Sequence, residues 1–225
     1  ENKLNIGSHV KFNGSLYESL KTAIDYGMYS LQIFMGNPKS FVRHKSDDAD
    51  IKKCKELLKK FPTHFISHYP YIANLAGSKY VAAWDGNKEQ DIKTQSVITN
   101  LEYELKIISN FTEKTNGVVI HPGNHVDKKK GLHSISQSIN KINFAPYSKL
   151  LLENSSGGGT SLATTFEEIK TIIDGVDEHK RNNVGVCIDT AHTFGYGLYD
   201  LRKCDEVKKM FVDFDRIIGK HKLCL

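Results

Sequence analysis

The sequence predicts an α/β protein with a parallel sheet, and more narrowly a (β/α)8 TIM barrel that is incomplete at its C-terminus. Short apolar runs alternate with amphipathic helical patterns along the chain, which is typical of a parallel sheet covered by helices. A histidine or a carboxylate ends five of these runs. A barrel collects such residues on one face, whereas an open doubly wound sheet concentrates its ligands at one switch point, so these positions favour the barrel.

Six strand and helix units can be marked in order. Apolar runs predict strands at residues 4–10, 30–35, 65–68, 117–121, 150–153 and 184–189, and residues 222–225 begin a seventh. Apolar residues at helical spacing follow these runs, at residues 16–24, 51–61, 98–108, 135–142, 166–173 and 207–218. Ser15 with Glu18, and Thr165 with Glu168, form capping boxes that mark two helix starts. Because a complete barrel has eight units, we expect about six units and the start of a seventh strand.

Composition is consistent with one domain over residues 1–225. The chain is 39% hydrophobic and 25% charged, and no apolar run approaches the roughly 18 residues of a membrane span. Residues 1–10 lack the basic start and apolar stretch of a secretory signal, and the four cysteines form no CxxC pair. We therefore expect a soluble intracellular protein, in the cytoplasm or nucleus, with no membrane partner. The net charge of +5 is weak evidence for a polyanionic partner.

Three loops between these elements have unusual composition. Residues 69–77 are aromatic and punctuated by glycine and proline, and loops of that length often have a function. Residues 128–130 are lysines, expected in the loop after the fourth strand, where a solvated face is the commoner reading and a phosphate contact the alternative. Residues 157–159 are glycines that could either present N–H groups to a phosphate or form a flexible turn.

The residues that end the apolar runs are of the types that bind zinc or a similar divalent metal. Glu153 follows three leucines, where a carboxylate needs a proton, a cation or a metal beside it. A single strand-end histidine is more often structural, but several together favour a metal centre. Asp189 and His192, three residues apart, could bind two neighbouring metals or act as a ligand and its orienting partner. The candidate metal ligands are His68, His121, Glu153, Asp189 and His192, and His125 is a possible further one.

Other catalytic chemistries fit the sequence less well. A serine nucleophile would need a G-x-S-x-G turn, which is absent around Ser155 and Ser156. Cys187 is expected inside a strand, where a thiol is usually inert. Tyr71 could unstack bases, but by sequence chemistry alone packing beneath its loop is the expected role.

Six blocks of this sequence resemble the endonuclease IV family of apurinic/apyrimidinic endonucleases, and they follow in the family's order across nearly the whole chain. They are Gly7-Ser8-His9-Val10, Phe34-Met35-Gly36-Asn37-Pro38-Lys39, His68-Tyr69-Pro70-Tyr71-Ile72-Ala73-Asn74-Leu75, His121-Pro122-Gly123, Leu152-Glu153-Asn154, and Asp189-Thr190-Ala191-His192-Thr193-Phe194. The resemblance implies a (β/α)8 barrel with three zinc ions. It also implies hydrolysis of the phosphodiester 5′ to an abasic site in duplex DNA, by a monomer acting in base excision repair.

The resemblance also assigns roles to single residues. His68, His121 and Glu153 look like the ligands of the first zinc, with the catalytic Glu153 bridging to a second zinc that Asp189 also binds. His192 resembles a ligand of the third. Clustered cations of this kind make a hydroxide nucleophilic at neutral pH and take up charge on the phosphate. The DNA contacts that the resemblance implies are His9, Lys39, Tyr71 and Asn74, with Lys39 standing where the family often has an arginine.

The resemblance ends before the family's last ligands, which are a histidine at the end of strand 7, an Asp-x-His pair and a glutamate on strand 8. None is present in residues 1–225. We therefore expect about one fully liganded zinc in this chain, and we expect these residues alone to cleave abasic DNA poorly or not at all. Two alternatives are a divalent-metal sugar isomerase or epimerase on the same barrel, and a binding module that holds damaged DNA without turnover.

Overall fold

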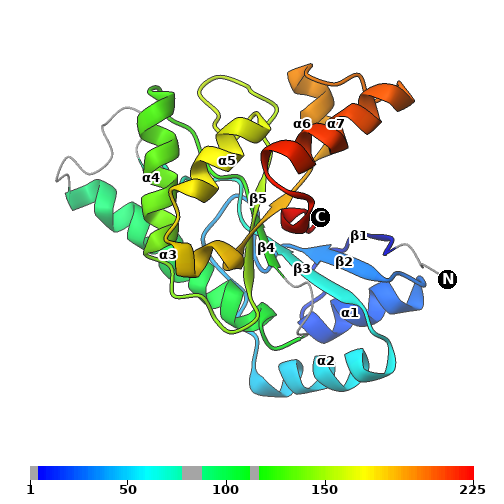
Figure 1. Ribbon diagram of the computed structural model, residues 1–225. Helices are drawn as coiled ribbons and strands as arrows, with labels where there is room; N and C mark the ends of the chain where they lie inside the picture. Colours follow the sequence, from blue (N-terminus) through cyan, green and yellow to red (C-terminus); the bar gives the residue numbers. More distant parts are fainter. Residues whose placement is uncertain (1–4, 78–87, 112–116) are drawn as a thin grey trace. The chain divides into compact units, whose positions relative to one another are not determined.

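The computed structural model describes residues 5–77, 88–111 and 117–225, in which parallel strands and helices alternate (Figure 1). The strands are hydrogen-bonded in the order of the sequence, β1 to β6. They are β1 (Gly7–His9), β2 (Ser30–Ile33), β3 (His64–His68), β4 (Gly117–Ile120), β5 (Lys149–Glu153) and β6 (Val184–Cys187). The α-helices are α1 (Leu16–Asp25), α2 (Asp48–Lys60), α3 (Lys88–Ile108), α4 (Lys128–Asn140), α5 (Phe166–Asp174), α6 (Thr190–Tyr196) and α7 (Cys204–Ile217), and η1 (Glu178–Asn183) and η2 (Lys220–Lys222) are 3-10 turns.

The described residues form two compact units, and the division passes through α3, β4 and β5. The first unit takes the described residues within 1–72, 100–119 and 143–149. The second takes those within 73–99, 120–142 and 150–225. No helix among the described residues is long and apolar enough to cross a membrane.

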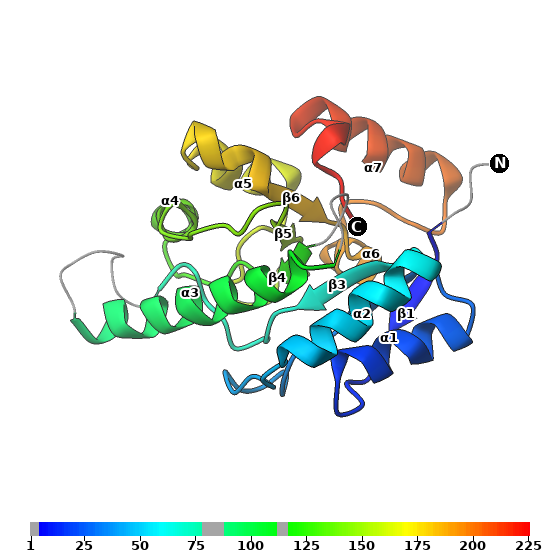
Figure 2. The same ribbon diagram turned by 90° about the horizontal axis from the view of Figure 1, so that it is seen from below.

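The first unit is built on parallel pairs between β1, β2, β3 and the start of β4. Helices α1 and α2 lie side by side next to it, as both views show (Figures 1 and 2). Ser15 caps α1 by accepting the Glu18 N–H, so the predicted helix start is confirmed. Asp50 of α2 accepts the N–H groups of Leu16 and Tyr17 at 2.8 and 3.1 Å. The two helices are thus joined through N–H groups that the first turn of α1 leaves unpaired.

A buried ion pair ties the loop after β2 to the rest of the first unit. Arg43 Nε lies 2.6 Å from Glu104 Oε1, and the two side chains are 5% and 0% exposed. Ser67 on β3 donates to the second oxygen of Glu104 at 2.5 Å, and the Arg43 guanidinium lies over the ring of Tyr69. Burial raises the pKa of Glu104 to about 7, although Arg43 opposes the shift.

The second unit is built on the parallel pair β5 and β6, with Leu150 opposite Val184 and Glu153 opposite Cys187. Helices α4, α5 and α7 pack in a row in this unit (Figures 1 and 2). The Thr165 hydroxyl accepts the Glu168 N–H at the start of α5, as the capping box predicts. Both strands are buried along their length, apart from Lys149 at the start of β5. Burial on both faces is what the apolar runs predict for parallel strands.

The start of a seventh strand is confirmed at the C-terminal end of the second unit. Leu223 forms a parallel bridge with Val186, and Ile188 donates its N–H to Leu225 at 2.8 Å. Gly185 permits this close packing, because a Cβ built there would lie 2.6 Å from Cys224 Sγ and 3.0 Å from the Leu151 side chain.

The structure corrects two sequence-based expectations. Residues 128–130 are not in a loop but form the first turn of α4, capped by Asp127. The Lys128 ammonium pairs with Glu168 at 2.6 Å. The sixth strand ends at Cys187, so Asp189 is not its last residue but the N-cap of α6, a helix that the sequence analysis did not predict. Seven residues are too few to display a helical period, which explains why α6 was missed.

Candidate metal centre

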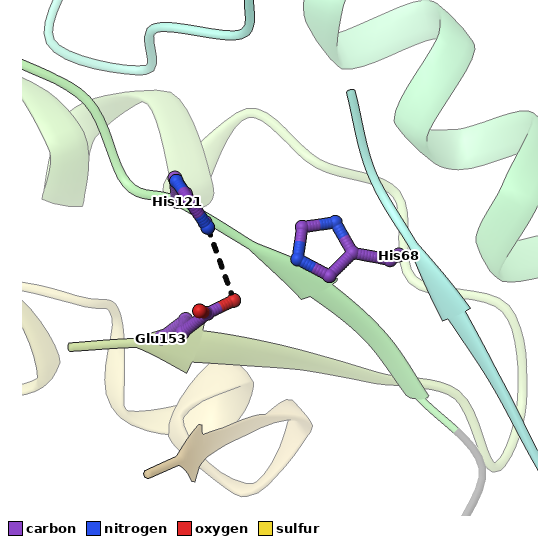
Figure 3. Close-up of side chains that lie close together, drawn as sticks. All are labelled: His68, His121 and Glu153. Atoms are coloured by element: carbon purple, nitrogen blue, oxygen red, sulfur yellow. Dashed lines mark ion pairs between the residues drawn. The ribbon is translucent and has the colours of Figure 1, made fainter. Parts of the chain in front are cut away.

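The centre of the candidate site is Glu153 at the end of β5. Its side chain is 4% exposed and lies between two imidazoles of the second unit. His121 Nε2 lies 3.3 Å from one carboxylate oxygen, along the dashed line of Figure 3, and His192 Nδ1 lies 3.2 Å from the other. The two imidazole rings are 5.5 Å apart, nearly perpendicular. The structure thus places two predicted imidazole ligands, His121 and His192, against the predicted carboxylate ligand.

His121 directly follows β4 and begins a loop that other segments of the second unit hold in place. Pro122 O accepts the Leu75 N–H at 3.0 Å, and Gly123 O accepts the Leu162 N–H at the same distance. The Asn74 amide oxygen accepts the Asn124 N–H, and its NH2 group donates to the Asn124 carbonyl oxygen. These contacts fix the backbone on the C-terminal side of the imidazole.

Asp189 and His192 are brought together by the first turn of α6. One carboxylate oxygen of Asp189 caps the helix by accepting the His192 N–H at 2.8 Å. The other lies 3.6 Å from His192 Nδ1. The spacing of three residues is therefore that of an N-cap and its partner in the first turn. Both side chains are partly exposed, at 33% and 27%.

The donor set of this cluster suits a divalent cation. A carboxylate as buried as Glu153 requires compensating positive charge, from an imidazolium or from a metal. Glu153, Asp189 and His192 each offer a ligand atom, and these atoms lie within 4.8 Å of one another. Imidazole nitrogen and carboxylate oxygen are ligands that zinc accepts. The residues present therefore fit the metal that the sequence analysis expects.

His68 ends β3 in the first unit and is 6% exposed. Its Nδ1 bonds to the carbonyl oxygen of Tyr69 at 2.7 Å. Because a carbonyl oxygen only accepts, Nδ1 carries the proton, which makes Nε2 the nitrogen suited to a metal.

Three of the four predicted DNA contacts lie in the first unit. Tyr71 is 51% exposed. Its ring centroid lies 5.3 Å from that of Phe34 and 5.2 Å from that of His68, in edge-to-face contacts. The ring of His9, at the end of β1, is tilted by 37° relative to that of Phe34, with the two ring centroids 4.7 Å apart. Phe34 therefore links the two predicted contacts, and sequence analysis gave it no role.

Lys39 is exposed in the loop after β2, where its N–H donates to the Asn37 side chain in a tight turn. The same loop reaches Tyr71, because the Tyr71 N–H donates to the Pro38 carbonyl at 3.0 Å. The sequence analysis proposed Lys39 and Tyr71 as separate DNA contacts. This backbone hydrogen bond connects the loop that carries Lys39 to Tyr71.

Asn74, the fourth predicted contact, lies in the second unit and uses its side chain within the protein. Its amide oxygen accepts the N–H groups of Ala76 and Asn124, and its NH2 group donates to the carbonyl oxygens of Gly77 and Asn124. Its role toward DNA stays a prediction, and its observed role is to brace the loop after His121.

The remaining candidates lie outside the cluster around Glu153. His125 is buried and bonds to the backbone of Asp127, which ties the end of its loop to the start of α4. The Cys187 thiol is buried, and burial raises its pKa, which disfavours the nucleophilic thiolate. Residues 157–159 lie in the loop after β5, where Gly157 lies against the ring of Tyr196, so no side chain fits at position 157.

Comparison with known proteins was made by sequence and by structure. The family model of the xylose isomerase-like TIM barrel matches residues 20–223. A "Probable endonuclease 4" of Halothermothrix orenii is 34% identical over 224 residues, which are 96% of this chain and 74% of the relative. Another, of Clostridium botulinum, is 32% identical and covers 98% of this chain and 74% of its own length.

Among solved structures, endonuclease IV from Thermus thermophilus matches with a TM-score of 0.73. The match covers 97% of this chain and 74% of that one, at 18% sequence identity. At this identity the likeness shows the fold alone, and it confirms the fold class predicted from the alternating strands and helices.

Proposed function

Since the chain belongs to the endonuclease IV family of xylose isomerase-like TIM barrels, we propose that it is a DNA repair endonuclease for abasic sites. Its reaction is hydrolysis of the phosphodiester 5′ to an abasic site in duplex DNA, in base excision repair. The observation that carries this proposal is the buried Glu153 carboxylate between His121 and His192. A buried acid with an imidazole on each side is suited to hold metal ions against a phosphate.

Zinc is the proposed metal. As the family resemblance implies, His68, His121 and Glu153 are the proposed ligands of a first zinc, Glu153 and Asp189 are ligands of a second, and His192 is a ligand of a third. Within the second unit, Glu153, Asp189 and His192 each offer a ligand atom, and these atoms lie within 4.8 Å of one another. Bound zinc would supply a Lewis acid that activates water at neutral pH and takes up charge on the phosphate. Glu153, as the shared ligand, is the proposed catalytic residue.

Proposed contacts with the duplex come from the aromatic group around Phe34 and from the loop beside it. Tyr71, half exposed above His68, can enter the duplex at the gap left by a missing base. His9 flanks Phe34, and Lys39 offers an exposed ammonium to the phosphate backbone. Asn74 contributes by holding the loop that carries His121. The proposed enzyme acts as a monomer.

The test is cleavage of a 5′-labelled duplex that contains one tetrahydrofuran abasic analogue, with zinc present and with chelator. We expect a single incision 5′ to the analogue, abolished by chelator. Glu153→Gln removes the negative charge that the proposed first and second zinc share, so it should lower the cleavage rate by at least ~100-fold. Glu56→Gln changes an exposed carboxylate on α2 in the same way and should leave the rate unchanged.

The same assay tests the proposal about residues 1–225 on their own. These residues supply three proposed ligands to the first zinc, but only Glu153 and Asp189 to the second and only His192 to the third. This stretch is therefore proposed to bind about one zinc tightly and to cleave poorly or not at all. Robust cleavage by this stretch with zinc would contradict the proposal. Salt-dependent binding of the abasic duplex without incision would instead support a binding module, and turnover of a free sugar would support an isomerase.

A further inference from the structure

The loop after β2, residues 36–43, closes on itself at its base. Gly36 and Arg43 form an antiparallel bridge there, and the His44 N–H donates to the Met35 carbonyl oxygen at 2.9 Å. A Cβ built at position 36 would lie 2.8 Å from Arg43 Nη1, so the glycine leaves room for the guanidinium. Backbone pairing and the Arg43 side chain thus meet at the same end of the loop.

The Arg43 side chain donates back into the loop that it closes. Its Nη1 donates to the carbonyl oxygens of Ser40 and Val42 at 3.1 and 3.0 Å. The side chain is only 5% exposed, so few water molecules can compete for these bonds. One buried side chain therefore holds two carbonyl groups of the loop.

The same guanidinium contacts the core of the first unit. Arg43 Nε lies 2.6 Å from Glu104 Oε1 on α3, and the guanidinium carbon lies 5.1 Å from the centroid of the Tyr69 ring. Ser67 of β3 donates to the other oxygen of Glu104, whose side chain is fully buried. A guanidinium can make these contacts together, because its N–H groups point in several fixed directions within one plane. Arg43 therefore joins the loop to α3 and β3.

Two of the proposed contacts with the duplex depend on this loop. Lys39 is an exposed residue of the loop, and its N–H donates to the Asn37 side chain at 2.8 Å. Tyr71 lies outside the loop, but its N–H donates to the Pro38 carbonyl oxygen at 3.0 Å. Because the Arg43 side chain is buried, its effect on recognition must pass through Lys39 and Tyr71.

We propose that Arg43 is a positioning residue, which holds residues 36–43 closed so that Lys39 and Tyr71 reach the duplex in one fixed arrangement. A loop that is ordered before binding loses less conformational freedom when its partner arrives, so its contacts yield more affinity. The proposal rests on the proposed function, since it concerns contacts with DNA. It assigns the buried arginine to recognition and not to the hydrolytic step.

Two variants release the loop in different ways. The first combines Arg43→Met with Glu104→Gln, so that no unpaired charge is left buried. The second is Arg43→Lys, which keeps a cation beside Glu104. A single ammonium cannot hold the carboxylate and both loop carbonyls at once, so this variant should also free the loop. If one variant does not fold, the other supplies the test.

The first measurement follows the loop without DNA. A lysine-specific protease cuts the Lys39–Ser40 bond when the loop opens, and the Lys21–Thr22 bond when α1 opens. Mass spectrometry gives the rate at each bond. The ratio of the Lys39 rate to the Lys21 rate should rise at least ~10-fold in both variants, because the loop opens without the helix. General destabilisation would raise both rates and leave the ratio near that of the unaltered chain.

The second measurement is binding of a labelled abasic duplex, by fluorescence anisotropy with chelator present. Both variants should bind about 5- to 150-fold more weakly, because Lys39 and Tyr71 must then be ordered when the duplex arrives. Lys39→Ala should weaken binding severalfold in the unaltered chain but by less than about twofold in either variant, since its contact already depends on Arg43.

The matched control is Arg181→Met. Arg181 also donates to two carbonyl oxygens, those of Val176 and Asp174, but it lies in the second unit. This control should match the unaltered chain in duplex affinity and in the ratio of protease rates.

An unchanged ratio of protease rates in the variants would overturn the proposal, and so would a raised ratio with unchanged affinity. A full effect of Lys39→Ala in the variants would also overturn it, because Arg43 would then act independently of the loop. If the unaltered chain binds an abasic duplex no better than an intact one, the proposed function fails. A raised ratio would in that case still establish that Arg43 holds the loop closed.

Discussion

A single carboxylate, Glu153, links most of the candidate chemistry. It is the last residue of a buried strand, and each of its oxygens lies within 3.3 Å of an imidazole. The protein interior would not retain that charge without a cation nearby. The placement of two imidazoles where a cation is required is the strongest structural argument for a metal at this position.

At the scale of single residues, Tyr71 provides a prediction about recognition. Tyr71→Ala should weaken binding to an abasic duplex by about 5- to 150-fold, since an aromatic that stacks in DNA contributes about 1–3 kcal/mol. Tyr71→Phe keeps the ring that meets Phe34 and His68, so it should bind within threefold of the unaltered chain. Fluorescence anisotropy with chelator present separates binding from cleavage.

The control for this prediction is Tyr26→Ala, which removes a tyrosine that is 78% exposed at the end of α1. It should bind like the unaltered chain. Equal loss of affinity for an abasic and an intact duplex in Tyr71→Ala would show that the ring makes only general contacts.

Sequence reasoning proposed the metal ligands because histidine and carboxylate side chains at strand ends are chemically distinctive. It gave no role to Asn154 or Phe34, because their partners are set by the fold. The Asn154 side chain accepts the Asp189 N–H, 35 residues later, and the Phe34 ring contacts those of Tyr71 and His9. An amide or a phenyl ring has no chemistry that reveals such partners before the fold is known.

At the scale of elements, the Arg43–Glu104 pair provides a prediction about stability. The raised pKa means that folded protein retains a proton on Glu104 where unfolded protein has lost it. The free energy of unfolding should therefore fall as pH rises from about 4.5, the ordinary value, to about 7. In Arg43→Met the fall should be larger and extend to higher pH, because the cation that opposes the shift is gone.

The measurement is urea unfolding of metal-free protein at several pH values from about 4.5 to about 8, which span the ordinary and the raised pKa. Residue 104 cannot titrate in Glu104→Gln, so this variant should lack the part of the fall in unfolding free energy with pH that Glu104 causes. Glu56→Gln replaces an exposed carboxylate and should retain that part. Identical slopes in Glu104→Gln and the unaltered chain would contradict the raised pKa.

The sequence was informative about elements that are long or capped and less so about short ones. The capping boxes at Ser15 and Thr165 marked helix starts correctly, since the side chain that accepts the N–H is itself in the sequence. The lysines of residues 128–130 were placed in a loop because a run of like charges contains no apolar residues whose spacing could indicate a helix. Their helix begins at the Asp127 cap, and Glu168 on α5 pairs with the first of them.

At the scale of the whole molecule, the alternation of strands and helices was sufficient to predict an incomplete TIM barrel. A single domain over residues 1–225 stays a prediction, because an apolar pattern reports which residues are buried and not how many compact units share them. The described residues gather in two units whose division cuts β4 and β5, the strands that lead to His121 and Glu153.

At this scale we predict that removal of the metal lowers the thermal stability of the protein. A ligand that binds only the folded chain stabilises it by about 2.7 kcal/mol at a hundredfold excess over its Kd. Zinc should therefore raise the Tm by roughly 5–10 °C in a chain of this size, and chelator should reverse the shift. Glu153→Gln should lose most of the shift. Zinc that binds stoichiometrically without changing the Tm would show that the ions bind outside the folded site.

The close packing at Gly185 has a consequence for how this sequence can vary. The Cβ of any other residue would meet Cys224, a residue in the segment that pairs with β6. It would also lie 3.0 Å from the Leu151 side chain on β5, so tolerance at position 185 depends on the neighbours of β6 and not on β6 alone. In a library of homologous or randomised sequences, larger residues at 185 should occur only together with smaller side chains at 224 and 151, which makes these positions vary together.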